Sequence, residues 1–397
     1  MESYSYKYLI VGGGMAADAA ARSIYDNDPK GSIGIISKDV DPPYARPPLS
    51  KALWKGEETI EDINLNTKEV SPTIHLERLV NKIDRSHKKV FDTQGNEYSY
   101  EKLLIASGGT PKKLPNIDEP GIIYYRTLSD YKKLLKIVDK NKKFAVLGGG
   151  FIGSEIAAAI KLYKPKAEIT MIFAEKGIGG LLFPESLSIY LNKYYQKRGI
   201  KIISGDLVNR ITKSKDGYMI ETRNNQKFEV DAVIAGLGIK PNIELAKEAD
   251  LKVEDGIVVN EYLQTSDKDV YAAGDVAVYY NSILNKMMRV EHEDNALVMG
   301  DIAGQNMTGK TNVYDHMSYF YSDLFDLGYE AVGTLDPKLE IIEDWKIPYE
   351  EGVVYYLKDG RIKGVLLWNV WEKTEEASEL IADTGPFSSS NLKGRIS

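Results

Sequence analysis

The hydrophobic positions near the start of the chain follow an order that predicts a strand, a turn and a helix. Residues 6–11 are apolar and partly β-branched, which is typical of a buried parallel strand. A glycine-rich turn follows at 12–17, then an alanine-rich helical stretch at 18–26 and a second strand at 32–37. The pattern predicts a βαβ unit at this end of the chain.

The same order recurs 136 residues later. Residues 144–147 predict a strand, 148–153 a glycine-rich turn, 154–162 a helix and 168–173 the next strand. The two turns fit the dinucleotide-binding fingerprint, as G-x-G-x-x-A in the first copy and G-x-G-x-x-G in the second. One such turn is weak support, but two copies predict an α/β chain with two dinucleotide sites.

The residue types at these turns suit a bound pyrophosphate. Gly12 permits the tight turn, Gly14 lets the backbone approach the phosphates, and Ala17 permits close packing of helix on strand. The helix N-terminus then offers unpaired N–H groups and a positive dipole end. Asp39 and Glu175 each stand 27 positions after the first glycine of their copy, where an acid suits the hydroxyls of a ribose.

Composition narrows the classes of function. A chain of 397 residues is long enough for two or three domains, and its net charge of −7 gives no reason to expect nucleic acid as a partner. Because the sequence has no cysteine, disulfide, thiolate-metal and iron–sulfur chemistry are excluded, and redox chemistry needs an organic cofactor. We read no signal peptide and no membrane span, and expect a cytoplasmic protein without a metal site.

A proline-rich segment at residues 41–56 is not needed for a bare nucleotide site. Its prolines make it rigid and disfavour a helix before Pro48, and it carries Arg46, Ser50 and Lys51. One interpretation is a solvated connector. The other is a rigid loop that places cations beside a flavin ring.

At this point the chain resembles the glutathione-reductase-type flavoproteins that lack a redox disulfide. It most resembles apoptosis-inducing factor and its relatives, with ferredoxin or rubredoxin reductases and monodehydroascorbate reductase close by. The resemblance covers roughly residues 7–383 and rests on the two fingerprints and on the motifs PPYARPPLSKALW, LLIASGGTP, AGLGIKPNIELAK, VYAAGDVA, RVEHEDNA and YFYSDLFDLGYEAVG.

The resemblance implies two Rossmann-like dinucleotide-binding domains and a C-terminal α/β cap. The FAD domain would comprise residues 1–112 and 240–310, the NAD(H) domain 113–239, and the cap 311–397. Strands are expected in the cap at 352–357 and 361–370. The tail after Thr384, with its serine run at 388–390, is expected to be poorly ordered.

The resemblance also implies two sets of cofactor-binding residues. Those on the FAD side are Gly12, Gly14, Ala17, Asp39, Arg46, Lys51, Val80, Ala106, Gly108, Arg126, Gly274, Asp275, Glu291 and His292. Those on the NAD side are Gly148, Gly150, Phe151, Ile152, Gly153, Glu155, Glu175, Gly238 and Tyr321.

Three residues are candidates for a catalytic role: Lys51, Glu155 and His292. Lys51 and Glu155 would pair beside the reacting flavin atom, one from each dinucleotide module, although Glu155 also fits as a first-turn acid favoured by the helix dipole. His292 would form a stacking wall at the nicotinamide, with a structural histidine as the alternative. A helix at 294–306 would point its N-terminus at the flavin.

An aromatic lid is also expected from the cap. Tyr321, or its neighbour Phe320, would supply it, and a buried core aromatic is the alternative.

The chain departs from the apoptotic relatives at several positions. Ile347 leads directly to Gly352 without their long insertion, which argues against an apoptotic or DNA-binding role. Lys38 precedes Asp39 in place of an acid, and Gly180 and Leu181 stand where the family has a cation. Glu293 and Asn295 replace histidines, a change that bears on flavin potential or acceptor choice.

Three functions fit these residues. The first is an NADH-dependent flavin reductase that passes electrons to a ferredoxin- or rubredoxin-type protein. The second is an NADH oxidase or a reductase of a quinone or monodehydroascorbate, and the third is an NADH-sensing interaction protein. We expect NADH to be preferred over NADPH because the Glu175 carboxylate would repel a 2′-phosphate, and a homodimer is one option.

Overall fold

The computed structural model describes residues 2–396 and divides the chain into two compact units. Unit 1 comprises residues 1–46, 60–110 and 240–318, and unit 2 comprises 47–59, 111–239 and 319–397. The nicotinamide-domain and cap ranges expected from the sequence therefore fall together in unit 2. Residues 47–59 belong to unit 2 as well, although the sequence placed them in the FAD domain.

Unit 1 is built around one mixed sheet. Its strands run in the order β3-β2-β1-β6-β5-β4, and β18 also pairs with β6. The bounds are β1 (Ser3–Val11), β2 (Ile33–Ile36), β3 (Thr73–His75), β4 (Val80–Asp84), β5 (Lys89–Asp92), β6 (Glu97–Ile105) and β18 (Val270–Ala272). β1, β2, β3, β6 and β18 pair in parallel, and β5 joins them antiparallel, so the parallel strands end at the same edge.

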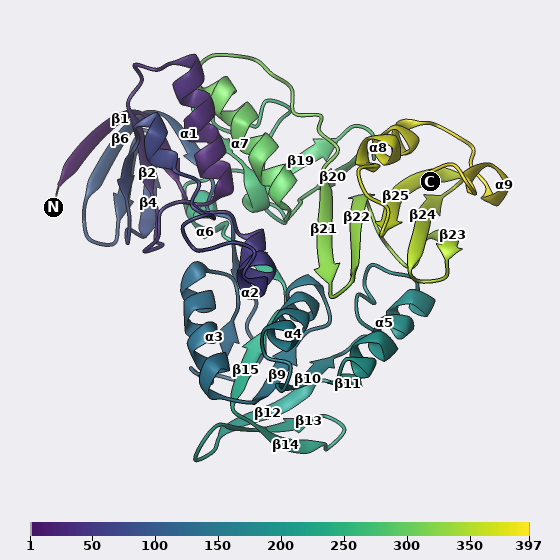
Figure 1. Cartoon of the computed structure of the whole chain (residues 1–397). Helices are drawn as coiled ribbons and strands as arrows, with labels where there is room; N and C mark the ends of the chain where they lie inside the picture. Colours follow the sequence, from purple (N-terminus) through teal and green to yellow (C-terminus); the bar gives the residue numbers. More distant parts are fainter. Residues whose placement is uncertain (1, 397) are drawn as a thin grey trace. The chain divides into compact units, whose positions relative to one another are not determined.

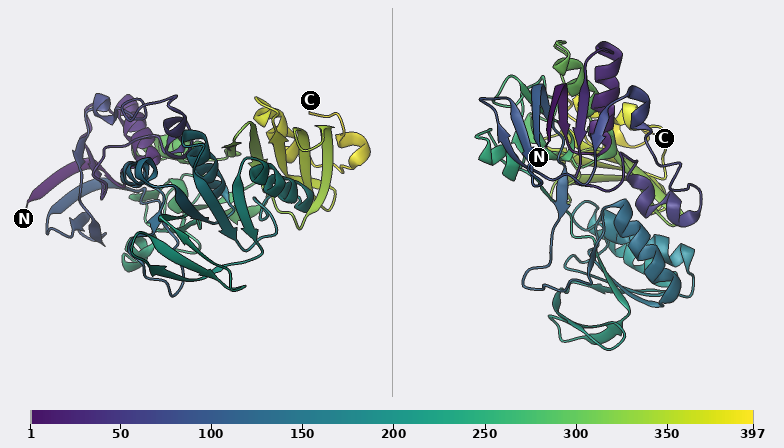
Figure 2. Two further views of the ribbon diagram at one scale, coloured as in Figure 1. Left: turned by 60° about the horizontal axis from the view of Figure 1, so that its bottom comes forward. Right: turned by 90° about the vertical axis from the view of Figure 1, so that its left-hand side faces the viewer.

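Two helices of unit 1 pack against each other beside this sheet. α1 (Met15–Asn27) and α7 (Glu293–Met307) lie side by side in both Figure 1 and Figure 2. Small residues permit the close approach, because a side chain at Gly300 would meet the Ala16 carbonyl oxygen at 2.4 Å. α7 covers the helix expected at 294–306, and the short α6 (Glu244–Glu248) lies elsewhere in the unit. A small sheet has the order β17-β19-β20 (Ile257–Val258, Ala277–Asn281, Lys286–Met288).

Unit 2 contains a second parallel sheet, of order β11-β10-β9-β15-β8. The bounds are β8 (Ile123–Tyr124), β9 (Lys143–Leu147), β10 (Glu168–Phe173), β11 (Ile200–Ser204) and β15 (Ala232–Ala235). The helices are α3 (Leu128–Lys140), α4 (Phe151–Tyr163) and α5 (Glu185–Lys197), and an antiparallel sheet has the strands β12 (Val208–Lys213), β13 (Tyr218–Thr222) and β14 (Lys227–Val230). The second βαβ repeat is thus β9-α4-β10, as the sequence predicted.

The C-terminal part of unit 2 is an antiparallel sheet of order β21-β22-β25-β24-β23. The bounds are β21 (Tyr319–Leu324), β22 (Leu327–Gly333), β23 (Glu340–Ile347), β24 (Glu351–Lys358) and β25 (Arg361–Trp368). α8 (Thr374–Ala382) packs against β22 and β25 (Figure 1). Within unit 2, Tyr329 of β22 stacks on Trp368 of β25, and Phe183 meets both rings edge-on.

The tail after Thr384 differs from the expectation of poor order. It forms α9 (Ser389–Leu392), and Leu392 and Ile396 are buried. The serine run that suggested poor order lies at the start of this helix, where the Ser388 N–H donates to Asn391 Oδ1 at 2.7 Å. Serine is a preferred residue at a helix start, so the same run of serines also suits an ordered element.

Residues 47–59 belong to unit 2 because their side chains are anchored there. η1 (Pro47–Ser50) and α2 (Ala52–Lys55) follow each other directly, with Lys51 as the N-cap of α2. Trp54 is 2% exposed and meets the Tyr131 ring edge-on at 5.4 Å. The Leu49 carbonyl accepts hydrogen bonds from Trp54 Nε1 and from the Tyr125 hydroxyl.

Candidate active site

The first fingerprint lies where β1 runs into α1. Gly12 has φ +129°, and a Cβ built on it would lie 2.1 Å from the Ala106 carbonyl oxygen. Only glycine fits here, because the position combines a positive φ with backbone contact. The N-cap of α1 is Gly14, which supplies no capping side chain, so the first-turn N–H groups can bind an anion. Gly108, beyond Ala106, also has a positive φ.

Asp39 follows β2 at the same edge of the unit 1 sheet. Its Oδ1 accepts from the Val40 N–H at 2.8 Å, and its Oδ2 accepts from the Tyr44 hydroxyl at 3.2 Å. These bonds hold the carboxylate in a fixed turn directly after the strand, where the sequence predicts a ribose-binding acid. Val80, predicted on the same side, is the first residue of β4 and packs against the core of unit 1.

The Gly274-Asp275 motif lies directly after β18, at the end of that parallel strand. Arg289 Nη1 donates to the Asp275 carbonyl oxygen at 3.0 Å and to Glu291 Oε1 at 2.6 Å. Glu291 is exposed, and its carboxylate forms an ion pair with Arg289. The motif is thus braced from the chain segment that leads into α7.

His292 is the N-cap of α7, and its carbonyl oxygen accepts the hydrogen bond of the Ala296 N–H at 3.0 Å. Burial lowers the pKa of His292 to about 4, against the nearby carboxylates of Asp275 and Asp294, which raise it. The imidazole is therefore neutral near pH 7. A neutral flat ring at this position suits stacking and adds no positive charge.

Asn295, one of the departures from the family pattern, is fully buried in unit 1. Its Oδ1 accepts from the Tyr314 hydroxyl at 2.7 Å and from Ser318 Oγ at 3.2 Å. Its Nδ2 donates to the Val290 carbonyl oxygen at 3.2 Å. The amide thus ties the start of α7 to residues 314–318, a contact that a histidine ring could not reproduce with the same bonds.

The second fingerprint has the same construction in unit 2. Gly148 has φ +108°, and a Cβ on it would lie 2.3 Å from the Gly236 carbonyl oxygen. A Cβ on Gly153 would lie 2.0 Å from the Gly148 carbonyl oxygen, whereas Gly150 meets nothing within 4 Å. Phe151 and Ile152 begin α4 with Gly150 as its N-cap, and Gly238, with φ +80°, follows β15.

Glu175 follows β10 and is half-buried, the counterpart of Asp39 in unit 1. Lys176 beside it forms an ion pair with Glu185, whose two oxygens lie 3.0 and 2.8 Å from Lys176 Nζ. The cation next to the predicted ribose acid therefore has a partner in unit 2. Gly180 packs close to Glu175, and Leu181 is 72% exposed.

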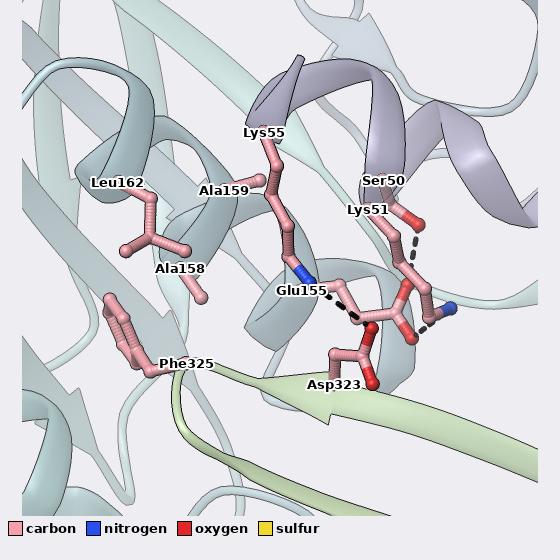
Figure 3. Close-up of a pocket in the computed structure, with 9 residues that line it drawn as sticks. All are labelled: Ser50, Lys51, Lys55, Glu155, Ala158, Ala159, Leu162, Asp323 and Phe325. Atoms are coloured by element: carbon pink, nitrogen blue, oxygen red, sulfur yellow. Dashed lines mark hydrogen bonds and ion pairs between the residues drawn. The ribbon is translucent and has the colours of Figure 1, made fainter. Parts of the chain in front are cut away.

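Lys51 and Glu155 form the ion pair expected from the sequence. Lys51 Nζ lies 2.8 Å from Glu155 Oε1, and the two side chains are 11% and 4% exposed. Figure 3 shows Lys51 and Ser50 both pointing at this carboxylate from the segment at 47–59. The pairing is as expected, but both partners lie in unit 2 and do not come from two separate units.

The Glu155 carboxylate accepts two hydroxyl hydrogen bonds besides the ammonium. Ser50 Oγ donates to Oε2, and Ser322 Oγ donates to Oε1 at 2.6 Å. Burial, and after it the charge of Glu155, raise the pKa of Tyr195 and Tyr329 well above the usual range. A buried carboxylate with three donors is satisfied electrostatically and fixed in orientation.

A shallow pocket opens beside this pair. Figure 3 shows Lys55 pointing to Asp323, with Nζ 3.5 Å from Oδ2, and the apolar wall formed by Leu162 and Phe325. Lys55 and Asp323 thus form a second, more exposed ion pair next to the buried one.

The two lid candidates differ in their surroundings. Phe320 is buried and meets Phe151 edge-on at 5.4 Å, so it is a core aromatic of unit 2. Tyr321 is 36% exposed, and Lys51 Nζ lies 5.0 Å from its ring centre. Of the two, Tyr321 is the more exposed, and its role as a lid stays a prediction.

Each unit gathers its own part of the predicted site. Lys51 and Arg126 are the exceptions: both were expected on the FAD side but lie in unit 2, where the Arg126 N–H donates to Asp130 Oδ2 at 3.1 Å. Arg46 is the last residue of unit 1 before the chain enters unit 2. Sequence reasoning missed Ser322 and Asp323. The signal that could have found them is their place next to Tyr321 on a strand.

A family model described as "Pyridine nucleotide-disulphide oxidoreductase" matches residues 6–300. The chain belongs to this family. A second model, "Apoptosis-inducing factor, mitochondrion-associated, C-term", matches residues 303–348 and 341–383 of the oxidoreductase. The branch named from the sequence motifs is confirmed.

Individual relatives of the oxidoreductase span nearly its whole length. "Apoptosis-inducing factor 1, mitochondrial" of Dictyostelium discoideum is 36% identical over 95% of this chain and 78% of its own. "Monodehydroascorbate reductase 3" of Arabidopsis thaliana is 32% identical over 97% and 94%. A solved structure of putidaredoxin reductase in covalent complex with putidaredoxin has a TM-score of 0.90 at 27% identity, covering 97% of this chain and 95% of that one.

The expected fold class is confirmed: α/β, with two dinucleotide-binding domains and a C-terminal domain. The protein is an FAD-dependent NAD(P)H oxidoreductase. The turns at Gly12 and Gly148 fit these dinucleotides, because a side chain at either glycine would clash with backbone and the fingerprint requires such a tight turn. Within residues 2–396, no helix is both long and apolar enough to cross a membrane.

Proposed function

We propose that this oxidoreductase takes a hydride from NADH and passes electrons to a small ferredoxin- or rubredoxin-type redox protein. The observation that best supports this class of electron acceptor is the match to putidaredoxin reductase bound to putidaredoxin, at a TM-score of 0.90 over 97% of the chain. The absence of cysteine from the sequence supports an external acceptor, since no thiol pair in the chain can take the electrons.

The residues that would hold the two cofactors are those at the strand ends. On the FAD side they are Gly12, Gly14, Asp39 and Asp275, and on the nicotinamide side they are Gly148, Gly150 and Glu175. When bound, the flavin supplies a two-electron acceptor for hydride that can release electrons one at a time. The protein contributes orientation and electrostatics.

Lys51 and Glu155 supply the electrostatics in this proposal. The Glu155 carboxylate fixes the Lys51 ammonium by an ion pair of 2.8 Å inside unit 2. A fixed cation in a largely dry site stabilises negative charge that develops on hydride transfer, without reorganisation at that moment. Tyr321, whose ring lies 5.0 Å from the same ammonium, covers it from the cap strand.

NADH is the proposed donor. Glu175 stands where the adenosine ribose is expected, and a carboxylate there would repel a 2′-phosphate. Lys176 would favour a phosphate, but its ammonium pairs with Glu185. The negative charge of Glu175 is therefore not offset by Lys176, and it favours NADH over NADPH.

A reductase of a small acceptor is the second candidate. The 32% identity to a monodehydroascorbate reductase over 97% of this chain favours it. The third candidate, an NADH-sensing interaction protein, rests on the relatives named for apoptosis and predicts slow turnover with every acceptor. A cytoplasmic location and a homodimer stay predictions from the sequence.

Steady-state NADH oxidation with a panel of acceptors tests the proposal. The panel contains a [2Fe–2S] ferredoxin, a rubredoxin, monodehydroascorbate, a quinone and oxygen. We expect the highest kcat/KM with one of the two redox proteins. A higher value with monodehydroascorbate or the quinone contradicts the proposed acceptor, and uniformly slow turnover favours the sensing role. Glu155→Gln serves as control, because it should slow the NADH half-reaction whichever acceptor follows.

A further inference from the structure

Four consecutive residues of β21 meet the buried ion pair and its surroundings. Successive side chains of a strand point to opposite faces. On one face Phe320 packs on Phe151 and Ser322 donates to Glu155. On the other face the Tyr321 ring lies beside Lys51, and Asp323 pairs with Lys55. The strand thus contacts both members of the Lys51–Glu155 pair.

The Ser322 hydroxyl is the most enclosed of these contacts. Ser322 is fully buried, and its Oγ lies 2.6 Å from Glu155 Oε1, the same oxygen that binds Lys51 Nζ at 2.8 Å. The other oxygen accepts from Ser50. With a donor on each oxygen, the carboxylate cannot rotate about its last bond without breaking a buried hydrogen bond, which is costly.

The strand position of Ser322 is itself held in place. Tyr329 lies opposite Ser322 in the antiparallel β21–β22 register. Tyr329 is in turn stacked on Trp368, with ring centres 5.5 Å apart. A chain of contacts therefore leads from the core of the C-terminal sheet through Tyr329 and Ser322 to Glu155.

A buried serine in unit 2 does not need a hydrogen bond from its side chain in order to pack. Ser188 in the same unit is 1% exposed, and its hydroxyl finds no hydrogen-bond partner in the described structure. Unit 2 therefore tolerates a buried serine without a directed bond, and the short bond from Ser322 to the ion-paired oxygen is a distinct feature.

We propose that Ser322 is a positioning residue for hydride transfer, which holds Glu155 so that its Oε1 fixes the Lys51 ammonium. The inference rests on the proposed role of the Lys51–Glu155 pair in flavin reduction by NADH. It assigns part of the catalytic geometry to the C-terminal sheet, which contributes no fingerprint of its own.

Anaerobic rapid mixing of the FAD-loaded protein with NADH tests the role. The variants are Ser322→Ala, the matched control Ser188→Ala, Glu155→Gln and the double variant Ser322→Ala/Glu155→Gln. We expect Ser322→Ala to lower the limiting rate of flavin reduction about three- to tenfold, with the NADH dissociation constant changed less than about twofold. Ser188→Ala should match the wild type, and Ser322→Ala should add nothing in the Glu155→Gln background.

Two results would overturn the inference about Ser322 and leave the proposed role of the Lys51–Glu155 pair intact. A wild-type limiting rate in Ser322→Ala, while Glu155→Gln is slow, removes Ser322 from the mechanism. An equal slowing by Ser322→Ala in both backgrounds shows a general structural effect that does not act through Glu155. A wild-type rate in Glu155→Gln overturns both the inference and the proposed role of the pair. If Ser322→Ala does not fold, Ser50→Ala removes the donor to the other oxygen and must slow the reduction in the same Glu155-dependent way.

Discussion

Removal of the Glu155 carboxylate should destabilise unit 2 strongly. In Glu155→Ala the Lys51 ammonium, on a side chain only 11% exposed, loses its ion-pair partner, and the Ser322 hydroxyl loses its acceptor. Breaking a buried pair from one side costs about 3–5 kcal/mol. We expect the lower end, about 3 kcal/mol, because the Tyr321 ring still faces the ammonium and retains a cation–π attraction.

The magnitude translates into a measurable melting shift. Unit 2 has about 220 residues, and in domains of this size each kcal/mol moves Tm by roughly 2–4 °C, so we expect a shift of about 6–12 °C. All four tryptophans of the chain, Trp54, Trp345, Trp368 and Trp371, belong to unit 2. Tryptophan fluorescence of the FAD-saturated protein during heating therefore reports the relevant transition.

An exposed ion pair in the same unit provides the control. The Lys176–Glu185 pair has side chains 73% and 61% exposed, so Glu185→Ala should cost at most about 1 kcal/mol. The double variant Lys51→Met/Glu155→Leu removes both charges and should recover at least half of the loss caused by Glu155→Ala. If Glu155→Ala melts within about 3 °C of Glu185→Ala, the carboxylate is not desolvated and the reasoning is wrong.

Three further outcomes follow from the two cofactor sites. NADH should give a higher kcat/KM than NADPH, and Glu175→Ala should bring the two kcat/KM values closer together. Equal kcat/KM values for the two donors in the unmodified protein would refute the role of Glu175 in donor choice. The pKa of His292 is lowered by burial to about 4 from 6.5. Between these values the unfolded chain binds the proton, so stability falls as pH drops from 6.5 to 4. His292→Gln should reduce this change of stability with pH, measured as Tm by circular dichroism. An unchanged pH dependence in His292→Gln would contradict the assignment to His292. Gly12→Ala should destabilise unit 1 by about 1–3 kcal/mol and lower the FAD content, because its Cβ meets the Ala106 carbonyl oxygen at 2.1 Å; a wild-type flavin content would contradict the role of this turn.

The local patterns predicted the local structure well. β1, α1 and β2, and their counterparts β9, α4 and β10, were read from apolar runs and glycine spacing, and each lies within a few residues of its expected bounds. These elements were predictable because a buried parallel strand and a glycine-rich turn have strong sequence signatures. Asp39 and Glu175 follow their strands for the same reason.

Contacts between distant segments were less predictable. The ion pair of Lys51 and Glu155 was anticipated from the family resemblance, but the partner hydroxyl of Ser322, 167 positions from Glu155, was not. No periodicity within β21 says which residue of another element lies opposite. The alternation in YFYSDL does separate Phe320 and Ser322 from Tyr321 and Asp323, and the burial of β21 follows it.

In two further segments the structure differs from the expectation because buried side chains anchor the segment. Residues 47–59 join unit 2 because Trp54 and Leu49 find partners on Tyr131 and Tyr125. The tail after Thr384 is ordered because Leu392 and Ile396 are buried, a contribution that its polar composition concealed. In both cases one or two apolar residues outweighed the average character of the segment.

The chain passes between the two units five times, after residues 46, 59, 110, 239 and 318. As a consequence, neither unit is complete until late in translation. β18, which pairs with β6, and α7, which packs on α1, are made some 160 residues or more after those partners. Unit 2 still lacks β21 and Ser322 when unit 1 has its last strand. A product truncated near residue 240 would expose the unpaired edge of β6 and the bare face of α1, so we expect such fragments to depend on chaperones or to aggregate.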